Sequence, residues 1–233
     1  HAGHIKTAYR LPDEAQLRNP RHLAALAQAC RQRGVHIVEQ APVTNFRING
    51  HRVTSVITPQ GEVSAEHFCL TTGAWTSQLL RELPLETGVL PIRGQMILFQ
   101  TAIPLLQHVI SEGPRYLVPR DDGRLLAGST EEDVGFVPET TPEGLAELRE
   151  FAFRLVPALQ DATIERTWAG LRPGTYDGLP YLGPLPGYSN AVVAAGHFRN
   201  GLYLSPATAV VVADLLENQP PRCDLRLFRT SRG

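Results

Sequence analysis

The spacing of apolar and polar positions divides the 233-residue chain into helical and extended segments. Residues 191–195 form a continuous apolar run, which is typical of a buried strand. A glycine turn with His197, Arg199 and Asn200 follows, and an Ala/Val-rich helix is predicted after it. A strand, a glycine turn and a helix in this order present backbone N–H groups and a helix N-terminus to an anionic ligand. Residues 191–202 are therefore predicted to form half of a binding site.

A second junction of this kind is predicted at residues 68–82. An apolar strand at residues 68–70 runs into Gly73 and then into a short helix near residues 77–82. Because the carboxyl ends of neighbouring strands meet at one edge of a sheet, we expect the two glycine turns to converge there.

An α–β unit is predicted between residues 19 and 38. Asn19 is predicted to be the helix N-cap and Pro20 the first helical residue, and Gly34 is predicted to end the helix. Residues 35–38 are predicted to form a short strand. Such a unit normally packs on a sheet begun earlier in the chain. The apolar residues at helical spacing are Leu23, Leu26, Ala27 and Cys30.

The middle of the chain is dominated by extended segments. Turn signals at Asn49-Gly50 and Gln60-Gly61 predict an antiparallel ribbon of three or four strands between residues 43 and 70. A helix is expected from Pro142 to about Pro157. The other predicted elements are a strand at 89–100, a hairpin at 115–120 and 124–128, a strand at 163–171, and a proline- and glycine-rich stretch at 172–187.

This order of elements predicts an α/β (α+β) fold in which an antiparallel or mixed-sheet domain is inserted into a Rossmann-like domain. The expected boundaries are a partial nucleotide-binding domain with the antiparallel ribbon at residues 1–75, a substrate-binding domain at 76–187, and the returning strand and helix of the first domain at 188–233.

Composition limits the classes of partner. The net charge of −1 gives no indication of binding to nucleic acid or to an acidic membrane surface. No apolar run approaches the roughly 20 residues that cross a bilayer. Cys30, Cys69 and Cys223 lack zinc-site spacing and are expected to be reduced thiols of a cytoplasmic protein. The acidic residues 131–133 are predicted to be an exposed loop, and no metal site is expected.

Several familiar catalytic motifs are absent from these 233 residues: GxSxG, the P-loop, HExxH and the dinucleotide fingerprint GxGxxG. Arg172 ends an apolar strand before a proline–glycine turn, so its side chain either ties down a loop or faces an anion such as a carboxylate. Tyr116 is either a core tyrosine or a ligand-binding hydroxyl. His197 is either a base or a cap on a neighbouring carbonyl. Trp75 and Trp168 are most simply core residues.

Taken together, the longer motifs resemble the glycine oxidase (thiamine-biosynthesis) branch of the D-amino acid oxidase family of flavoproteins. The resemblance rests on Trp168-Ala-Gly-Leu-Arg-Pro through Gly183 and on Gly196-His-Phe-Arg-Asn-Gly through Thr208. It extends to residues 72–75, 93–95, 116–120 and 127–130, so that it covers most of the chain in the family's order.

The resemblance implies a non-covalent FAD enzyme that oxidises glycine, sarcosine or small D-amino acids to imino acids and reduces O2 to H2O2. It implies that Arg172 clamps the substrate carboxylate, that the Tyr116 hydroxyl lies beside it, and that Arg199 lines the same pocket. Hydride transfer from Cα needs no protein base if the amine arrives neutral, so an arginine–tyrosine clamp suffices for positioning.

The resemblance also implies a set of FAD contacts. The backbone of Val43 is expected to meet the adenine, and Gly73 belongs to the matching Thr72–Trp75 motif. The segment that wraps the isoalloxazine ring is expected to be His197, Phe198, Arg199, Asn200, Gly201, Leu202 and Tyr203. Many sarcosine oxidases attach flavin through a cysteine near the final glycine motifs, and the absence of cysteine between residues 168 and 204 favours non-covalent binding.

One departure from the family's pattern concerns the cofactor. The family begins with a βαβ unit that carries the glycine fingerprint and holds the FAD pyrophosphate, and these residues do not contain it. The chain is therefore expected to be a fragment or a truncated product that binds FAD weakly or not at all by itself. The alternative is a non-catalytic, truncated substrate-binding module. Relatives commonly form homodimers or homotetramers, so the oligomeric state stays open.

Overall fold

The computed structural model describes residues 5–83, 85 and 87–232 and divides the chain into two compact units. Unit 1 comprises His1–Gln40, Gly94–Glu131 and Pro138–Gly170, and unit 2 comprises Ala41–Arg93, Glu132–Val137 and Leu171–Gly233. Strands β5 (Leu90–Gln100) and β10 (Thr163–Gly174) belong partly to each unit. The domain boundaries expected from the sequence, at residues 75 and 187, separate nucleotide binding from substrate binding, and they stay a prediction.

Unit 1 is built on the sheet with strand order β10-β5-β8-β7-β6, in which β6 is Ile110–Glu112, β7 is Arg115–Pro119 and β8 is Arg124–Gly128. The pairs β5–β8, β8–β7 and β7–β6 are antiparallel. The predicted hairpin is confirmed, with Tyr116 opposite Gly128 in its register. Met96 of β5 also lies opposite Gly128, so three strands bring Tyr116, Gly128 and Met96 into one row.

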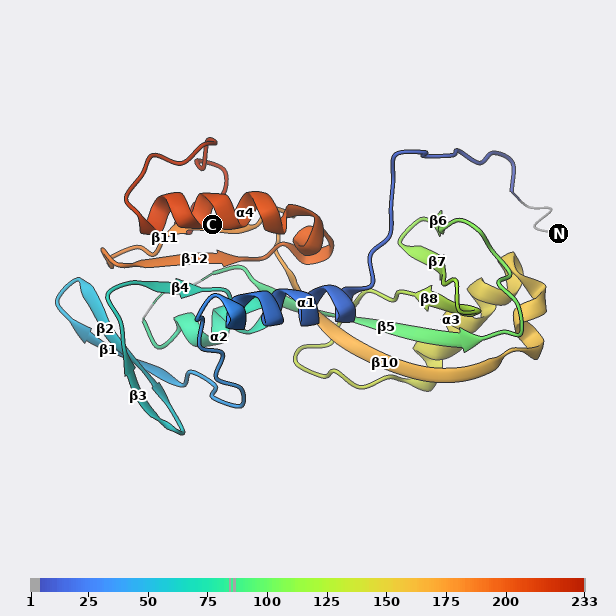
Figure 1. The fold of residues 1–233 in the computed structure, drawn as a ribbon, viewed down its shortest axis with the longest axis horizontal. Helices are drawn as coiled ribbons and strands as arrows, with labels where there is room; N and C mark the ends of the chain where they lie inside the picture. Colours follow the sequence, from blue (N-terminus) through green and yellow to red (C-terminus); the bar gives the residue numbers. More distant parts are fainter. Residues whose placement is uncertain (1–4, 84, 86, 233) are drawn as a thin grey trace. The chain divides into compact units, whose positions relative to one another are not determined.

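Helix α3 (Pro142–Leu155) packs its apolar side on this sheet (Figure 1). The Thr141 hydroxyl caps the helix by accepting a hydrogen bond from the Gly144 amide at 3.2 Å. The negative charge of Glu143 in the first turn interacts favourably with the positive end of the helix dipole. The 3-10 helix η2 (Pro157–Asp161) follows. The core between the sheet and these two helices consists of Ile97, Phe99, Leu117, Leu125, Ala127, Leu148, Phe151, Ala152, Val156 and Leu159.

Helix α1 (Asn19–Gln32) is confirmed as a helix but differs from expectation in its packing. Its N-cap is Arg18 rather than Asn19, and none of its residues is buried. Its apolar stripe does not pack on a sheet among the described residues, and its packing on a sheet begun earlier in the chain stays a prediction. Residues 35–38 do not form the predicted strand, because no described strand lies beside them to accept and donate the ladder hydrogen bonds.

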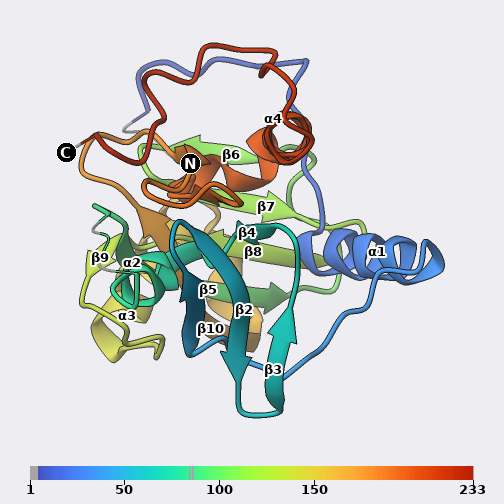
Figure 2. The same ribbon diagram turned by 90° about the vertical axis from the view of Figure 1, so that its left-hand side faces the viewer.

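Unit 2 begins with the antiparallel ribbon β1 (Asn45–Asn49), β2 (Arg52–Thr58) and β3 (Gly61–Ser64), which confirms the prediction for this segment (Figure 2). Gly50 supplies the positive φ of +58° that the first turn requires. The buried side chain of Asn190 ties the ribbon to the rest of the unit. Its Oδ1 accepts from the Val53 amide at 3.0 Å, and its Nδ2 donates to the Val53 carbonyl at 2.7 Å.

The central sheet of unit 2 has the order β11-β12-β4, with β11 at Tyr181–Pro184, β12 at Ala191–Ala195 and β4 at Phe68–Leu70. Strands β12 and β4 are parallel, with Val193 opposite Leu70. Strand β4 leads into η1 (Gly73–Trp75) and α2 (Thr76–Leu80). Strand β12 leads into η3 (Phe198–Asn200) and α4 (Gly201–Leu216), which lies along β11 and β12 (Figure 1). The predicted convergence of the two junctions is therefore confirmed.

Two further predictions, one about Trp75 and one about the acidic residues 131–133, are corrected. Trp75 is 53% exposed rather than part of the core, and its ring contacts that of Phe136 at a centroid distance of 6.1 Å. The acidic segment is not wholly an exposed loop, because β9 (Glu132–Asp133) pairs with β5 and Glu132 binds the buried guanidinium of Arg93. Among the described residues, no helix is both long and apolar enough to cross a membrane.

Candidate functional site

The carboxyl ends of β4 and β12 form an open edge lined by glycine. Gly73 has φ +55° and Gly196 has φ +80°, a region that side chains disfavour. A Cβ at Gly73 would meet nothing within 4 Å, so the backbone there is accessible to a ligand. Parallel strands direct both turns to the same edge of the sheet. The backbone at this edge therefore suits close approach by a planar or anionic group.

Gly196 also connects this edge to the strand that carries Arg172. A Cβ built at Gly196 would lie 2.6 Å from Cγ2 of Thr175 and 3.5 Å from Cα of Pro180. Thr175 comes directly after β10, and its hydroxyl donates to the Leu179 carbonyl at 3.0 Å. The end of the Arg172 strand is thus packed against the turn after β12.

The turn between β12 and α4 has an unusual backbone. Phe198 has φ +47°, which costs free energy for an aromatic residue and marks a conformation that the surroundings impose. Helix α4 begins at Gly201 without a side-chain cap, because Asn200 at the N-cap makes no such hydrogen bond. The N–H groups of its first turn therefore remain suited to a ligand, with the positive end of the helix dipole behind them.

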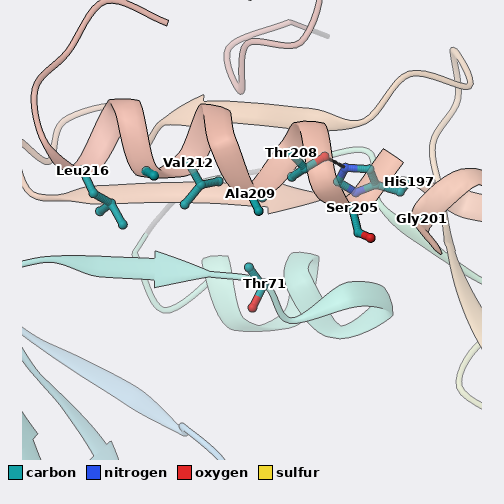
Figure 3. A pocket seen from close by; sticks show the side chains of 10 residues that line it. Thr71, His197, Gly201, Ser205, Thr208, Ala209, Val212 and Leu216 are labelled. Atoms are coloured by element: carbon teal, nitrogen blue, oxygen red, sulfur yellow. Dashed lines mark hydrogen bonds between the residues drawn. The ribbon is translucent and has the colours of Figure 1, made fainter. Parts of the chain in front are cut away.

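His197 is held by the helix that follows it. Its Nε2 and the Thr208 hydroxyl share a hydrogen bond of 2.9 Å (Figure 3). Burial lowers the pKa of the His197 imidazole, so the neutral ring is favoured. A neutral ring fixed at one nitrogen can donate or accept at the other, depending on its tautomer.

A mainly apolar pocket of about 490 Å³ lies between α4 and the end of β4. Figure 3 shows Thr208, Ala209, Val212 and Leu216 along one side of α4, with Thr71 across from them. His197, Gly201 and Ser205 complete the end of the pocket nearest the turn. Two of the residues expected to contact FAD, His197 and Gly201, thus line one cavity.

The structure places the expected substrate residues in different units. Arg172, on β10, is half-buried, and Arg199, in η3, is exposed; both belong to unit 2. Tyr116 is half-buried on β7 of unit 1, and its hydroxyl donates to Sδ of Met96 at 3.6 Å. Gly128 leaves space for this ring, since a Cβ there would lie 2.9 Å from Cε2 of Tyr116. The arginine–tyrosine clamp stays a prediction.

The remaining expected FAD contacts are distributed over unit 2. Val43 is half-buried, packs against the core and precedes β1. Leu202 and Tyr203 lie in the first turn of α4 and are 38% and 88% exposed. Their roles in FAD binding stay predictions, as do those of Phe198 and Asn200.

Several residues with contacts in or near these sites could not be assigned a role from the sequence. Thr208 lies in a quoted motif, but its bond to His197 depends on how α4 folds back after the turn. Thr175 acts through its contact with Gly196. Gln95 accepts from the Thr141 amide at 2.8 Å and donates to its hydroxyl at 3.1 Å. These contacts join residues distant in the chain, and the only local signal was the presence of Gln95 in the Arg93–Gln95 motif.

Comparisons with known proteins agree with this geometry. A family model described as FAD dependent oxidoreductase matches residues 2–215. Glycine oxidase of Pseudomonas aeruginosa is 39% identical over 224 residues, which are 96% of this chain and 61% of that protein. Glycine oxidase of Bacillus subtilis is 36% identical over 210 residues, or 89% of this chain and 56% of that protein.

A solved structure extends the likeness to the fold. The glycine oxidase of Geobacillus kaustophilus superposes with a TM-score of 0.85 at 36% identity, covering 90% of this chain and 57% of that one. The chain spans about three fifths of the length of these relatives. The match of fold, motifs and sequence over most of its length shows that the chain belongs to the family of FAD-dependent oxidoreductases that contains the glycine oxidases.

Proposed function

We propose that this chain supplies the substrate-binding side and the flavin-ring side of an FAD-dependent oxidase of small amino acids. The substrate class is glycine, sarcosine or a small D-amino acid. The reaction converts the amino acid and O2 into the imino acid and H2O2. The similarity to proteins named glycine oxidase supports this substrate class.

The observation that carries the proposal is the meeting of three segments at one sheet edge. The Gly73 turn and the Gly196 turn follow neighbouring parallel strands, and the segment after Arg172 packs on Gly196 through Thr175. Open space at Gly73 and the uncapped start of α4 fit the close approach of a flat ring system with an electron-rich edge. These features belong to unit 2 and are suited to the isoalloxazine end of FAD.

The residues of this chain would act by positioning and electrostatics. The guanidinium of Arg172 would bind the substrate carboxylate with two parallel hydrogen bonds, and Arg199 would add positive charge beside it. Backbone N–H groups after Gly196 would stabilise negative charge that develops on the ring. When bound, FAD supplies the two-electron acceptor that O2 reoxidises. The neutral His197 would contribute a hydrogen bond rather than a charge.

Arg172→Ala in an active, longer form of the chain tests the clamp. Loss of a charge-assisted bidentate pair should weaken binding of glycine or D-alanine by about 2–5 kcal/mol, seen as a steep rise in KM. Arg166→Ala on the same strand is the matched control, because Arg166 packs over the Trp168 ring instead, 5.6 Å from its centroid. An unchanged KM in the Arg172 variant would remove this residue from substrate binding.

A second candidate function is a non-catalytic module that binds a small carboxylate without FAD. The visible spectrum of the purified chain after incubation with FAD and dialysis separates the readings, together with peroxide release from glycine. We expect weak or no retained flavin. A stoichiometric, dialysis-resistant flavin band would contradict that expectation and exclude the module.

A further inference from the structure

A second pocket, lined by arginines of unit 1, has no role in the proposed oxidase site. Arg18 is the N-cap of α1, Arg21 lies in the first turn of that helix, and Arg120 directly follows β7. With Gln16, Asp121 and Asp122 they line a polar pocket of about 360 Å³. Two segments about a hundred residues apart in the chain thus hold three guanidinium groups around one space.

Most of the carboxylate charge near this pocket is already paired. Asp122 binds Arg18 at 3.3 Å and Arg124 at 3.1 Å, and Arg124 also binds Glu165 at 2.7 Å. Arg120 donates to the uncharged amide oxygen of Gln16 at 2.9 Å. The Arg21 side chain makes no hydrogen bond or ion pair within the described part of the chain. Within the described residues, Arg21 and Arg120 therefore lack a bonded carboxylate, and Asp121, which also lines the pocket, has no ion pair with either of them.

The local field adds to this positive charge. Burial, followed by the neighbouring charges of Arg18 and Arg21, lowers the pKa of the Arg120 guanidinium, while Asp122 acts in the opposite direction. Helix α1 has fourteen residues, no acidic residue in its first turn and no side-chain cap, so its positive end also faces this region uncompensated. Holding like charges together costs free energy, and a bound anion relieves that cost.

We propose that this pocket binds a phosphate group, either as inorganic phosphate or as part of a small phosphate monoester. The two guanidinium groups without a carboxylate partner match the charge of a phosphate dianion, and their planar forks match its oxygen atoms. The volume of the pocket exceeds what the phosphate group alone requires and leaves room for a small substituent. The proposal concerns unit 1 and does not depend on the oxidase function.

Calorimetric titration of the 233-residue chain at pH 8 tests the site. The probes are inorganic phosphate and glycerol phosphate, with sodium chloride at matched ionic strength as the reference. We expect saturable binding of phosphate that chloride does not reproduce. Tighter binding of glycerol phosphate would identify a monoester as the source of the group, and equal binding would identify free phosphate.

Three variants make the test specific. Arg21→Gln should weaken phosphate binding by about tenfold or more. The residue is exposed and has no hydrogen bond or ion pair within the described residues, so the substitution should leave folding intact. Arg47→Gln, which removes an exposed arginine from β1 of unit 2, should leave binding unchanged. Asp121→Asn should tighten binding, because it removes a negative charge from the lining of the pocket. Signals that follow ionic strength alone, or equal affinity in the Arg21 variant and the unaltered chain, would overturn the proposal.

Discussion

Gly196 occupies a position in the candidate site where both the backbone angle and the available space favour glycine. Its φ of +80° disfavours any side chain, and the contact with Thr175 leaves no space for a Cβ. The glycine turn itself was predicted from the sequence, because a strand that breaks at glycine is a local pattern. The contact with Thr175 was not predicted, because it depends on packing between segments 21 residues apart.

Gly196→Ala should therefore lower the free energy of unfolding by about 1–3 kcal/mol through backbone strain and displacement of Thr175. Gly170→Ala is the matched control, since a Cβ there would meet nothing within 4 Å. That variant should be neutral or slightly stabilising, by up to about 1 kcal/mol. Urea unfolding measures both. Equal effects of the two substitutions would show that the turn tolerates a side chain.

His197 should make stability depend on pH. Because burial holds its folded-state pKa below the ordinary value of 6.5, the unfolded chain takes up this proton first as the pH falls. The stability that His197 contributes is present above about pH 6.5 and is lost as the pH falls through the folded-state pKa.

Urea unfolding at pH 7.5 and pH 5 should show a smaller loss of stability for His197→Gln than for the unaltered chain. His36→Gln, at an exposed position, should retain the original pH dependence. Asp177 affects stability over a different pH range. Its hydrogen bond from Arg232 lowers its pKa to about 2, so the stability that its carboxylate contributes is lost only below about pH 4. An identical pH dependence in the His197 variant would contradict the prediction.

At the scale of secondary-structure elements, the pairing of β5 with β9 depends on a largely buried charge. The Arg93 side chain is 6% exposed and binds Glu132, whose side chain is 25% exposed. The sequence shows an arginine in a motif and an acidic segment, but the two residues that pair are 39 positions apart in the chain. Local patterns do not specify which carboxylate meets which guanidinium, so the acidic segment was predicted to be exposed.

Glu132→Gln should cost about 3 kcal/mol, because it removes the charge of a carboxylate that binds the buried Arg93. Glu39→Gln breaks the exposed pair with Arg31 and should change stability by less than about 0.5 kcal/mol. Chemical denaturation of both variants tests the difference. A loss no larger for Glu132 than for Glu39 would mean that Arg93 is satisfied by its other contacts.

At the scale of the whole molecule, apolar surface is left uncovered on several elements. Only Val211 and Asp214 of the sixteen residues of α4 are buried, although the helix is largely apolar. Strand β4 pairs with β12 on one side and with no second strand among the described residues. Helix α1 likewise buries none of its side chains. Surfaces of this kind are unfavourable in water and are typical of faces that another part of a protein covers.

A chain extended upstream to the length of the relatives should cover these surfaces. We expect slower hydrogen exchange at the amides of Phe68–Leu70 and weaker binding of an apolar dye than in the 233-residue chain, because an additional strand and helix would cover the edge and the groove. The longer chain should also retain FAD. Unchanged exchange and dye binding would show that α4 and β4 are exposed in the longer protein as well.

The sequence alone determined the features that depend on neighbours a few residues away. These include the hairpin turns at Gly50 and residues 121–123, the start of α3 at Pro142, and the two strand–glycine junctions. Glycine and proline restrict or release the backbone locally, and apolar spacing reveals which face is buried, so these patterns can be recognised without a structure. The long motifs also sufficed to indicate the flavoprotein family.

Tertiary structure alone decided which distant segments meet. It joined Glu132 to Arg93, His197 to Thr208 and Thr175 to Gly196, and gathered three arginines around the pocket of unit 1. It also left residues 35–38 without a strand partner. The physical reason is that sheet pairing, burial and ion pairs depend on partners far along the chain, whose identity no local pattern contains.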